Sequence, residues 1–203
     1  MGISRNSDGS LSLTADRLPS GVWGSNLRVI LPRPRWEELS RRTAERAGRL
    51  CEVCRQPSRY GHKTRNPDCH EIWSFNDAGG AAVQRLVGVV ALCGACHETQ
   101  HSGLAEVNGR GEFVVETLMR VNDWSSDEAE ADIEDSVKRW GRLTTVDWAL
   151  DLAALDGWLT LEGFSSLVVG AEARAILGNT IDGLPRKLSV VVGGHIPEAV
   201  WTW

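Results

Sequence analysis

The spacing of apolar residues predicts helices in two parts of the chain. From Pro34 onwards, apolar and small residues recur every three or four positions, which is the period of a helix with one buried face, and Gly48 provides a natural end. The segment SSDEAEADIEDSVKRWG, residues 125–141, has the same period, and Ser125 and Glu128 match a capping box at its start. We therefore expect an amphipathic helix in each segment.

Other segments have the pattern of strands. RLVGVVAL is an almost continuously apolar run between polar flanks, and DCHEIWSF combines β-branched and aromatic residues. Two further segments are expected to be extended, one before the first helix and one near the C-terminus. These four segments are VWGSNLRVIL (22–31), DCHEIWSF (68–75), RLVGVVAL (85–92) and LSVVVGG (188–194). A mixture of helices and strands in this order predicts an α+β protein.

Length and composition bound the class of protein. At 203 residues, with 42% hydrophobic and 24% charged residues, the chain has the composition of a soluble globular protein with one sizeable core. No apolar run approaches the roughly 20 residues of a membrane-spanning helix. The first ten residues, MGISRNSDGS, lack the apolar stretch of a secretory signal. We therefore expect a cytoplasmic protein without a membrane partner.

Charge is distributed unevenly along the chain. The net charge is −5, yet residues 1–67 carry 13 Lys and Arg against 6 Asp and Glu, while residues 68–203 carry 9 against 21. The helix predicted from Pro34 has four arginines on its polar side, namely Arg41, Arg42, Arg46 and Arg49. This asymmetry indicates either a nucleic-acid-facing segment that contacts phosphates or a solvated basic surface.

Four of the five cysteines form two C-x-x-C pairs, Cys51 with Cys54 and Cys93 with Cys96. In a reducing compartment this spacing favours a metal over disulfides. Tetrahedral zinc takes four thiolates at about 2.3 Å, and the two pairs can supply them. We expect a closed structural zinc site that contributes to folding rather than to catalysis. The alternative is a set of four buried or redox-active thiols.

A second group of metal ligands directly follows the second pair. His97 and His101 stand four residues apart in ALCGACHETQH (91–101), so on one helix that ends before Gly103 they share a face. Two imidazoles in this arrangement can hold a second metal ion, and the strand DCHEIW (68–73) could bring further side chains to it. The alternative is a capped surface helix with incidental histidines.

The same stretch contains HETQH, which matches the H-E-x-x-H string of zinc peptidases, with His97 and His101 as ligands and Glu98 as base. Such an enzyme needs a third ligand, for which Glu112 or Glu116 is available. It would leave the two cysteine pairs unexplained, and its catalytic helix would begin at its own ligand. The peptidase is therefore the weaker interpretation, and Glu98 is then an exposed residue favoured by the helix dipole.

Taken together, CEVC (51–54), CHEIW (69–73) and LCGACHETQH (92–101) resemble the HNH endonuclease family and its ββα-metal fold. The resemblance implies a treble-clef-like, zinc-stabilised nuclease core with an N-terminal helix at residues 23–103. Flanking helices and a small C-terminal α/β extension of unknown role would follow at 104–203. Residues 1–22 would precede the core as a flexible segment.

The resemblance also implies the roles of the site residues. His70 would act as general base on a water, while His97 and His101 hold one divalent ion, which is Mg²⁺, Mn²⁺ or another. The position before the base, commonly a metal ligand in the family, holds Cys69. Either Cys69 or Glu71 could ligate, or the register shifts so that His70 ligates and Glu71 stands at the base position.

A second departure concerns the middle asparagine of the family signature, which normally orients the hairpin and whose place falls at Gly88. His62 or Asn76 could substitute for it. The sequence predicts a metal-dependent endonuclease that hydrolyses phosphodiester bonds of double-stranded DNA, with the C-terminal part adding core, specificity or self-association. The alternative is a zinc-stabilised nucleic-acid-binding or adaptor protein on the same fold that does not cleave.

Overall fold

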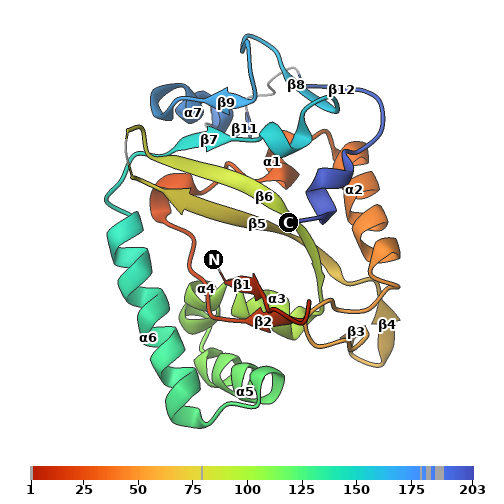
Figure 1. Ribbon diagram of the computed structural model, residues 1–203, viewed down its shortest axis with the longest axis vertical. Coiled ribbons are helices and arrows are strands. Elements are labelled where there is room, and N and C mark those ends of the chain that lie inside the picture. Colours follow the sequence, from red (N-terminus) through yellow and green to blue (C-terminus); the bar gives the residue numbers. More distant parts are fainter. Residues whose placement is uncertain (1, 79, 179, 182–183, 186–189) are drawn as a thin grey trace. The chain divides into compact units, whose positions relative to one another are not determined.

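The computed structural model describes residues 2–78, 80–178, 180–181, 184–185 and 190–203 (Figure 1). The protein is of mixed α+β type, as the sequence predicts. Its residues form two compact units, and each unit is assembled from three separate segments of the chain. The first consists of Met1–Pro19, Arg41–His70 and Val90–Leu143, and the second of Ser20–Ser40, Glu71–Val89 and Thr144–Trp203. This division differs from the sequential ranges 23–103 and 104–203.

The first unit contains two hairpins and a series of helices. Its elements are β1 (Ile3–Arg5), β2 (Leu11–Leu13), the second half of α2 (Arg33–Arg46), β3 (Ser58–Tyr60), β4 (Lys63–Arg65), α3 (Gly94–Thr99), α4 (Ser102–Val107), α5 (Gly111–Asn122) and α6 (Ser126–Leu143). Helices α5 and α6 pack together and bury Val114 and Leu118. The predicted helix at 125–141 is α6, and its capping box is present, since the N–H of Ser125 donates to Glu128 at 2.8 Å.

The N-terminal segment, expected to be flexible, contains the β1–β2 hairpin. Ile3 and Leu13 are buried, and the side-chain amide of Asn122 in α5 donates to the Leu13 carbonyl at 2.7 Å. The Leu13 N–H donates back to the same side chain at 3.2 Å. One amide therefore satisfies a donor and an acceptor of the hairpin, which fixes β2 against α5.

The strands predicted at 68–75 and 85–92 are confirmed as β5 (Asp68–Asn76) and β6 (Val83–Leu92), which are neighbours in one sheet (Figure 1). Helix α3 follows β6 directly, so the chain order here is strand, strand, helix. The single helix expected to end before Gly103 is instead two short helices, because the backbone at His101 leaves the helical region (φ −120°, ψ 41°). Gln100 at this break donates to two carbonyls of the N-terminal segment, at 2.9 and 2.8 Å.

The second unit contains the remaining elements. They are η1 (Ser20–Val22), α1 (Leu27–Ile30), the first half of α2, β7 (Ala149–Asp151), η2 (Ala153–Leu155), β8 (Leu159–Leu161), β9 (Val168–Val169), α7 (Ala171–Gly178), β10 (Thr180–Ile181), β11 (Leu184–Pro185), β12 (Val190–Val192) and η3 (Glu198–Trp201). The larger sheet has the order β5-β6-β7-β9, with β6 and β7 parallel and β7 and β9 antiparallel.

Two predicted extended segments need comment. The prediction of an extended piece at 22–31 was wrong: Val22 ends the short 3₁₀ helix η1, residues 23–24 form a turn, and α1 follows, where the side chain of Asn26 accepts from the N–H of Val29 and caps the helix. Of the strand predicted at 188–194, β12 covers Val190–Val192, while Leu188 and Ser189 lie outside the described residues. Within the part of the chain that the structure describes, no helix has the length and apolar character needed to cross a membrane.

Candidate metal centres

The four cysteines of the two C-x-x-C pairs lie together in the first unit, with their sulfur atoms all within 4.8 Å of one another. The Sγ atoms of Cys54 and Cys93 are 3.6 Å apart. A zinc ion bound tetrahedrally at about 2.3 Å from each sulfur requires sulfurs about 3.8 Å apart, so a group of this size can hold zinc. The sequence prediction of a four-cysteine cluster able to hold a metal such as zinc is confirmed.

Backbone hydrogen bonds explain why the two pairs meet. In the first pair, the N–H of Cys51 donates to the Gln56 carbonyl and that of Arg55 returns to the Cys51 carbonyl, both at 2.9 Å, which closes a tight knuckle. Glu52, between the two cysteines of this pair, then joins it to the end of β6. Its N–H donates to the Ala91 carbonyl at 2.8 Å, and its carboxylate accepts from the Ala91 N–H at 2.7 Å. The second pair begins two residues after Ala91.

The thiols also influence one another. The hydrogen bond with Cys51 lowers the pKa of Cys54 to about 7. A lowered pKa favours the thiolate, which is the form that binds zinc.

A second group, formed by His70, His97 and His101, lies in the same unit, with its ligand nitrogens within 4.8 Å of one another. The Nε2 atoms of His97 and His101 are 3.3 Å apart, and the His70 ring centroid is 5.2 Å from each of the other two. Nitrogens bound at about 2.1 Å to one ion lie about 3.0–3.4 Å apart, so the pair on the helices fits a shared metal. The predicted grouping of these three histidines is thus present.

His70 is the buried member of this group. Only 8% of the residue is exposed, and its Nδ1 atom is buried without a hydrogen-bond partner among the described residues. Burial, and then the neighbouring His97 and His101, hold the pKa of His70 well below 6.5. Burial likewise lowers the pKa of His101 to about 4. Both rings are therefore neutral at pH 7, which is the state that can bind a metal or accept a proton.

Asp68 is a member of the site that the sequence analysis did not identify. Its Oδ2 atom lies 3.4 Å from Nδ1 of His97 and accepts from Arg65 at 2.9 Å. Although burial raises the pKa of Asp68, His97 and Arg65 outweigh this effect and lower it below the usual value. A carboxylate on the outer nitrogen of a histidine fixes the ring and directs its other nitrogen to the metal. The available signal was the D-x-H spacing, which places Asp68 and His70 on one face of a strand.

Cys69 and Glu71 flank His70 in β5, and neighbouring strand residues point to opposite faces. The thiol of Cys69 lies 3.6 Å from the hydroxyl of Thr43, and the carboxylate of Glu71 accepts from the N–H of Leu27 at 2.9 Å. Neither residue belongs to the histidine group. The structure therefore does not bring the predicted catalytic Glu71 to the histidines, nor Cys69 as a ligand.

Gly88, where the resemblance leads one to expect an asparagine, lies in the second unit beside the C-terminal residues. A β-carbon here would collide with the ring of Trp203 and the carbonyl of Val200. The Trp203 indole also donates to the Val89 carbonyl at 3.2 Å. The C-terminal tryptophan thus fills the space beside β6 that a larger residue at position 88 would need.

The two residues considered as substitutes for that asparagine have other surroundings. His62 is exposed in the turn between β3 and β4, and the side chain of Asn76 accepts from the N–H of Ala78 at 2.9 Å. Neither residue belongs to the metal-ligand groups found in the described part of the chain.

The structure gives the peptidase interpretation little support. Glu98, its expected base, forms an ion pair with Arg110. The two groups of candidate ligands within the described residues include neither Glu112 nor Glu116 as a third ligand. Helix α3, which contains the first histidine of the H-E-x-x-H string, ends at Thr99, before the second histidine.

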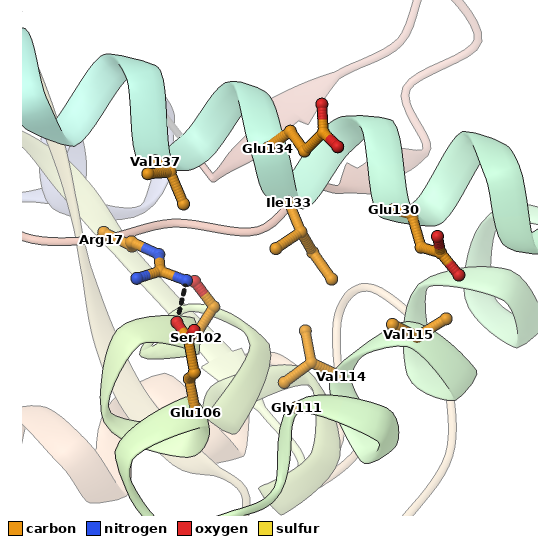
Figure 2. Close-up of a pocket in the computed structure, with 10 residues that line it drawn as sticks. All are labelled: Arg17, Ser102, Glu106, Gly111, Val114, Val115, Glu130, Ile133, Glu134 and Val137. Atoms are coloured by element: carbon orange, nitrogen blue, oxygen red, sulfur yellow. Dashed lines mark hydrogen bonds and ion pairs between the residues drawn. The ribbon is translucent and has the colours of Figure 1, made fainter.

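A cavity of about 350 Å³ lies elsewhere in the same unit, lined by residues of α4, α5 and α6 (Figure 2). Figure 2 shows Ile133 of α6 pointing towards Val114 of α5, and Arg17 paired with Glu106 at the edge. The lining contains none of the cysteines or histidines of the two metal-ligand groups. We therefore assign this cavity no part in the metal chemistry.

Comparisons of the chain with protein-family models, with curated proteins and with solved structures found no match. The chemistry of the two groups of ligands is therefore what indicates a function.

Proposed function

We propose that this protein is a metal-dependent endonuclease of the HNH type that hydrolyses phosphodiester bonds of double-stranded DNA. The observation that carries the proposal is the pairing of a four-cysteine group with a three-histidine group through consecutive residues, Cys96 and His97, of one helix. The chain order of β5, which carries His70, then β6, then α3, which carries Cys96 and His97, supports the ββα arrangement that the resemblance implies.

The histidine group has the features that such chemistry needs. His97 and His101 would hold a divalent ion, and Asp68 would orient His97. When bound, such an ion supplies Lewis-acid stabilisation of the charge that develops on the phosphate and the leaving oxygen. His97 is 30% exposed in its side chain, so the group is open to a substrate on one side.

His70 can serve this site in one of two ways. As general base, its neutral ring would take the proton of the attacking water. As third ligand, it would complete a three-histidine set, which the mutual distances of the three rings also fit. The affinity of His70→Ala for the divalent ion distinguishes the two roles. If His70 is the base, the variant should bind this ion as tightly as the wild-type chain. If His70 is a ligand, the variant should bind it more weakly, as His97→Ala should.

Nicking of a supercoiled plasmid in the presence of Mg²⁺ or Mn²⁺ tests the proposed function. We expect nicking by the wild-type chain and its loss in both His70→Ala and His97→Ala, each retaining one zinc ion per chain. Binding of DNA without nicking by the wild-type chain would instead support the alternative function, a zinc-stabilised nucleic-acid-binding protein. Hydrolysis of a peptide substrate that Glu98→Ala abolishes would support the peptidase.

A further inference from the structure

Strands β3 and β4 form a two-stranded hairpin, residues 58–65, that we call the ribbon. Its pairs are Ser58 with Arg65, Arg59 with Thr64, and Tyr60 with Lys63, joined by a two-residue turn in which Gly61 has φ +58°. Glycine with positive φ at this place is typical of tight hairpin turns. Every residue from 59 to 66 is exposed. An isolated two-stranded hairpin without a buried face is at best marginally stable in water, so contact with a partner would stabilise it.

The ribbon is fixed at its base by the two metal-ligand groups. Its first strand follows the knuckle of Cys51 and Cys54, and a bridge between Leu50 and Pro57 continues the pairing below it. Its second strand ends at Arg65, which donates to Asp68, and Asp68 in turn lies beside His97. The ribbon thus leads directly to the histidine group within the same unit.

The charge of the ribbon differs from that of helix α2. In α2, three arginines are paired with glutamates of the same helix: Arg33 with Glu37, Arg35 with Glu38, and Arg41 with Glu45. Residues 53–67, by contrast, contain four basic residues and no Asp or Glu, the basic ones being Arg55, Arg59, Lys63 and Arg65. Each of these three arginines of α2 thus has an acidic partner within its own helix, whereas residues 58–65 contain no acidic residue and Arg65 pairs with Asp68 beyond the ribbon.

The two faces of the ribbon carry complementary groups for a nucleic acid. Tyr60 shares one face with Lys63 and Arg65, and Arg59 lies on the other, because paired residues of a hairpin share a face and successive residues alternate. Tyr60 is 79% exposed. Cations beside an exposed aromatic ring are typical of surfaces that contact phosphates and bases. The major groove of DNA is wide enough to admit a two-stranded ribbon.

We infer that the ribbon binds double-stranded DNA next to the histidine group, with Arg59 and Lys63 on phosphates and Tyr60 in the groove. This inference rests on the proposed function for the nature of the substrate. The three residue pairs span about 7 Å along the strands. A duplex held with a phosphate at the histidines therefore passes within reach of the ribbon's cations.

Salt-dependent binding of a short DNA duplex tests the inference, with His97→Ala as parent so that cleavage does not interfere. The ribbon variant is Arg59→Gln with Lys63→Gln, and the matched control is Arg33→Gln with Arg41→Gln, which removes the same charge from α2. Each phosphate contact contributes about 0.9 to the magnitude of the slope of log affinity against log salt concentration. Because the ribbon variant lacks two such contacts, we expect the magnitude of its slope, measured from roughly 50 to 200 mM salt, to be smaller by about 2. The control should keep the slope of the parent.

A third variant, Tyr60→Ala, should weaken binding without changing the slope, because it removes a contact that releases no counterion. Equal losses in the ribbon and control variants would overturn the inference, since the charge would then act diffusely. Unchanged duplex binding by the ribbon variant would also overturn the inference. If that variant bound the duplex normally but no longer bound poly-glutamate, the partner of the ribbon would be an acidic protein and not DNA. Zinc content and thermal midpoint equal to those of the parent establish that each variant is folded.

The same variants in the wild-type background separate this inference from the proposed function. Ribbon-dependent binding with no nicking under any divalent ion contradicts the endonuclease and leaves the ribbon assignment standing. Nicking that the ribbon variant retains with an unchanged KM contradicts the ribbon assignment and leaves the endonuclease standing. An increase in KM with little change in kcat is the expected result.

Discussion

Cys96 and His97 are consecutive residues of α3, yet the groups to which they belong have different surroundings. Three of the four cysteines are buried, and the N–H and carboxylate of Glu52 form hydrogen bonds with Ala91 that join the first pair to the end of β6, just before the second pair. In the histidine group only His70 is buried, while His97 and His101 are partly exposed. A closed set of four thiolates suits a structural ion, whereas an open set of three imidazoles leaves room for a further ligand. One short helix can therefore contribute a ligand to each of two different groups, because its successive side chains point in different directions.

The largest effect that separates the two groups should come from Cys51→Ser. Loss of one thiolate should release zinc and unfold the first unit, because structural zinc contributes about 10–16 kcal/mol to the folding of small zinc domains. Metal analysis and thermal unfolding followed by circular dichroism measure both quantities. A variant that lacks zinc but melts at the wild-type temperature would show that the cysteine group is not structural.

The next effect should come from His97→Ala, which should keep the fold and abolish the proposed nicking activity. We expect one zinc ion per chain, a thermal midpoint within a few degrees of wild type, and no detectable plasmid nicking, since the open group loses a ligand while the closed group is untouched. Parallel zinc and nicking assays measure this. Loss of zinc in this variant would mean that the two groups are not independent, and the comparison would fail.

Asp68→Asn should have an intermediate effect. The substitution keeps the shape of the side chain but removes the charge beside Nδ1 of His97, and loss of such an outer partner typically lowers metal affinity or activity by about 10- to 100-fold. Nicking rates as a function of Mn²⁺ concentration distinguish a weaker metal affinity from a lower maximal rate. Rates equal to wild type would leave Asp68 with only a structural role through Arg65.

The sequence predicted both groups of ligands because each is formed by short local motifs. C-x-x-C spacing, and histidines four apart beside it, bring neighbouring ligands together locally. The meeting of the two cysteine pairs depends in addition on the hydrogen bonds between Glu52 and Ala91, and His70 joins the other histidines from β5. The sequence also predicted the strands β5 and β6 and the helices α2 and α6, because the apolar pattern of each extends over many residues. It did not predict the break at His101, which depends on hydrogen bonds from Gln100 to residues more than 80 positions away. Asp68 was missed because the family pattern directed attention to positions 69 and 71, on the opposite face of the strand.

Gly88→Ala tests whether the two groups are also independent of the second unit. The added methyl group would meet Trp203 and the Val200 carbonyl, and overpacking of this kind costs about 1–3 kcal/mol. We expect a lower free energy of unfolding, with zinc content and metal-dependent nicking unchanged in the folded protein. Urea unfolding followed by tryptophan fluorescence measures the loss. A matching loss in Trp203→Ala, and no additional loss in the double variant, would confirm the contact.

The smallest effect should come from Cys69→Ala, which removes the one cysteine outside the four-thiol group. Its thiol faces Thr43 rather than either group of ligands, so the variant should bind one zinc ion and nick DNA at the wild-type rate. The buried Thr43 hydroxyl loses a weak partner, and we expect destabilisation of about 1 kcal/mol. Cys54→Ala is the matched comparison, because Cys54 is more exposed than Cys69 but belongs to the four-thiol group. We expect Cys54→Ala to lose the zinc. If Cys69→Ala also lost the zinc, or lost the second ion, the fifth thiol would be a ligand, and the separation into a sulfur group and an imidazole group would be wrong.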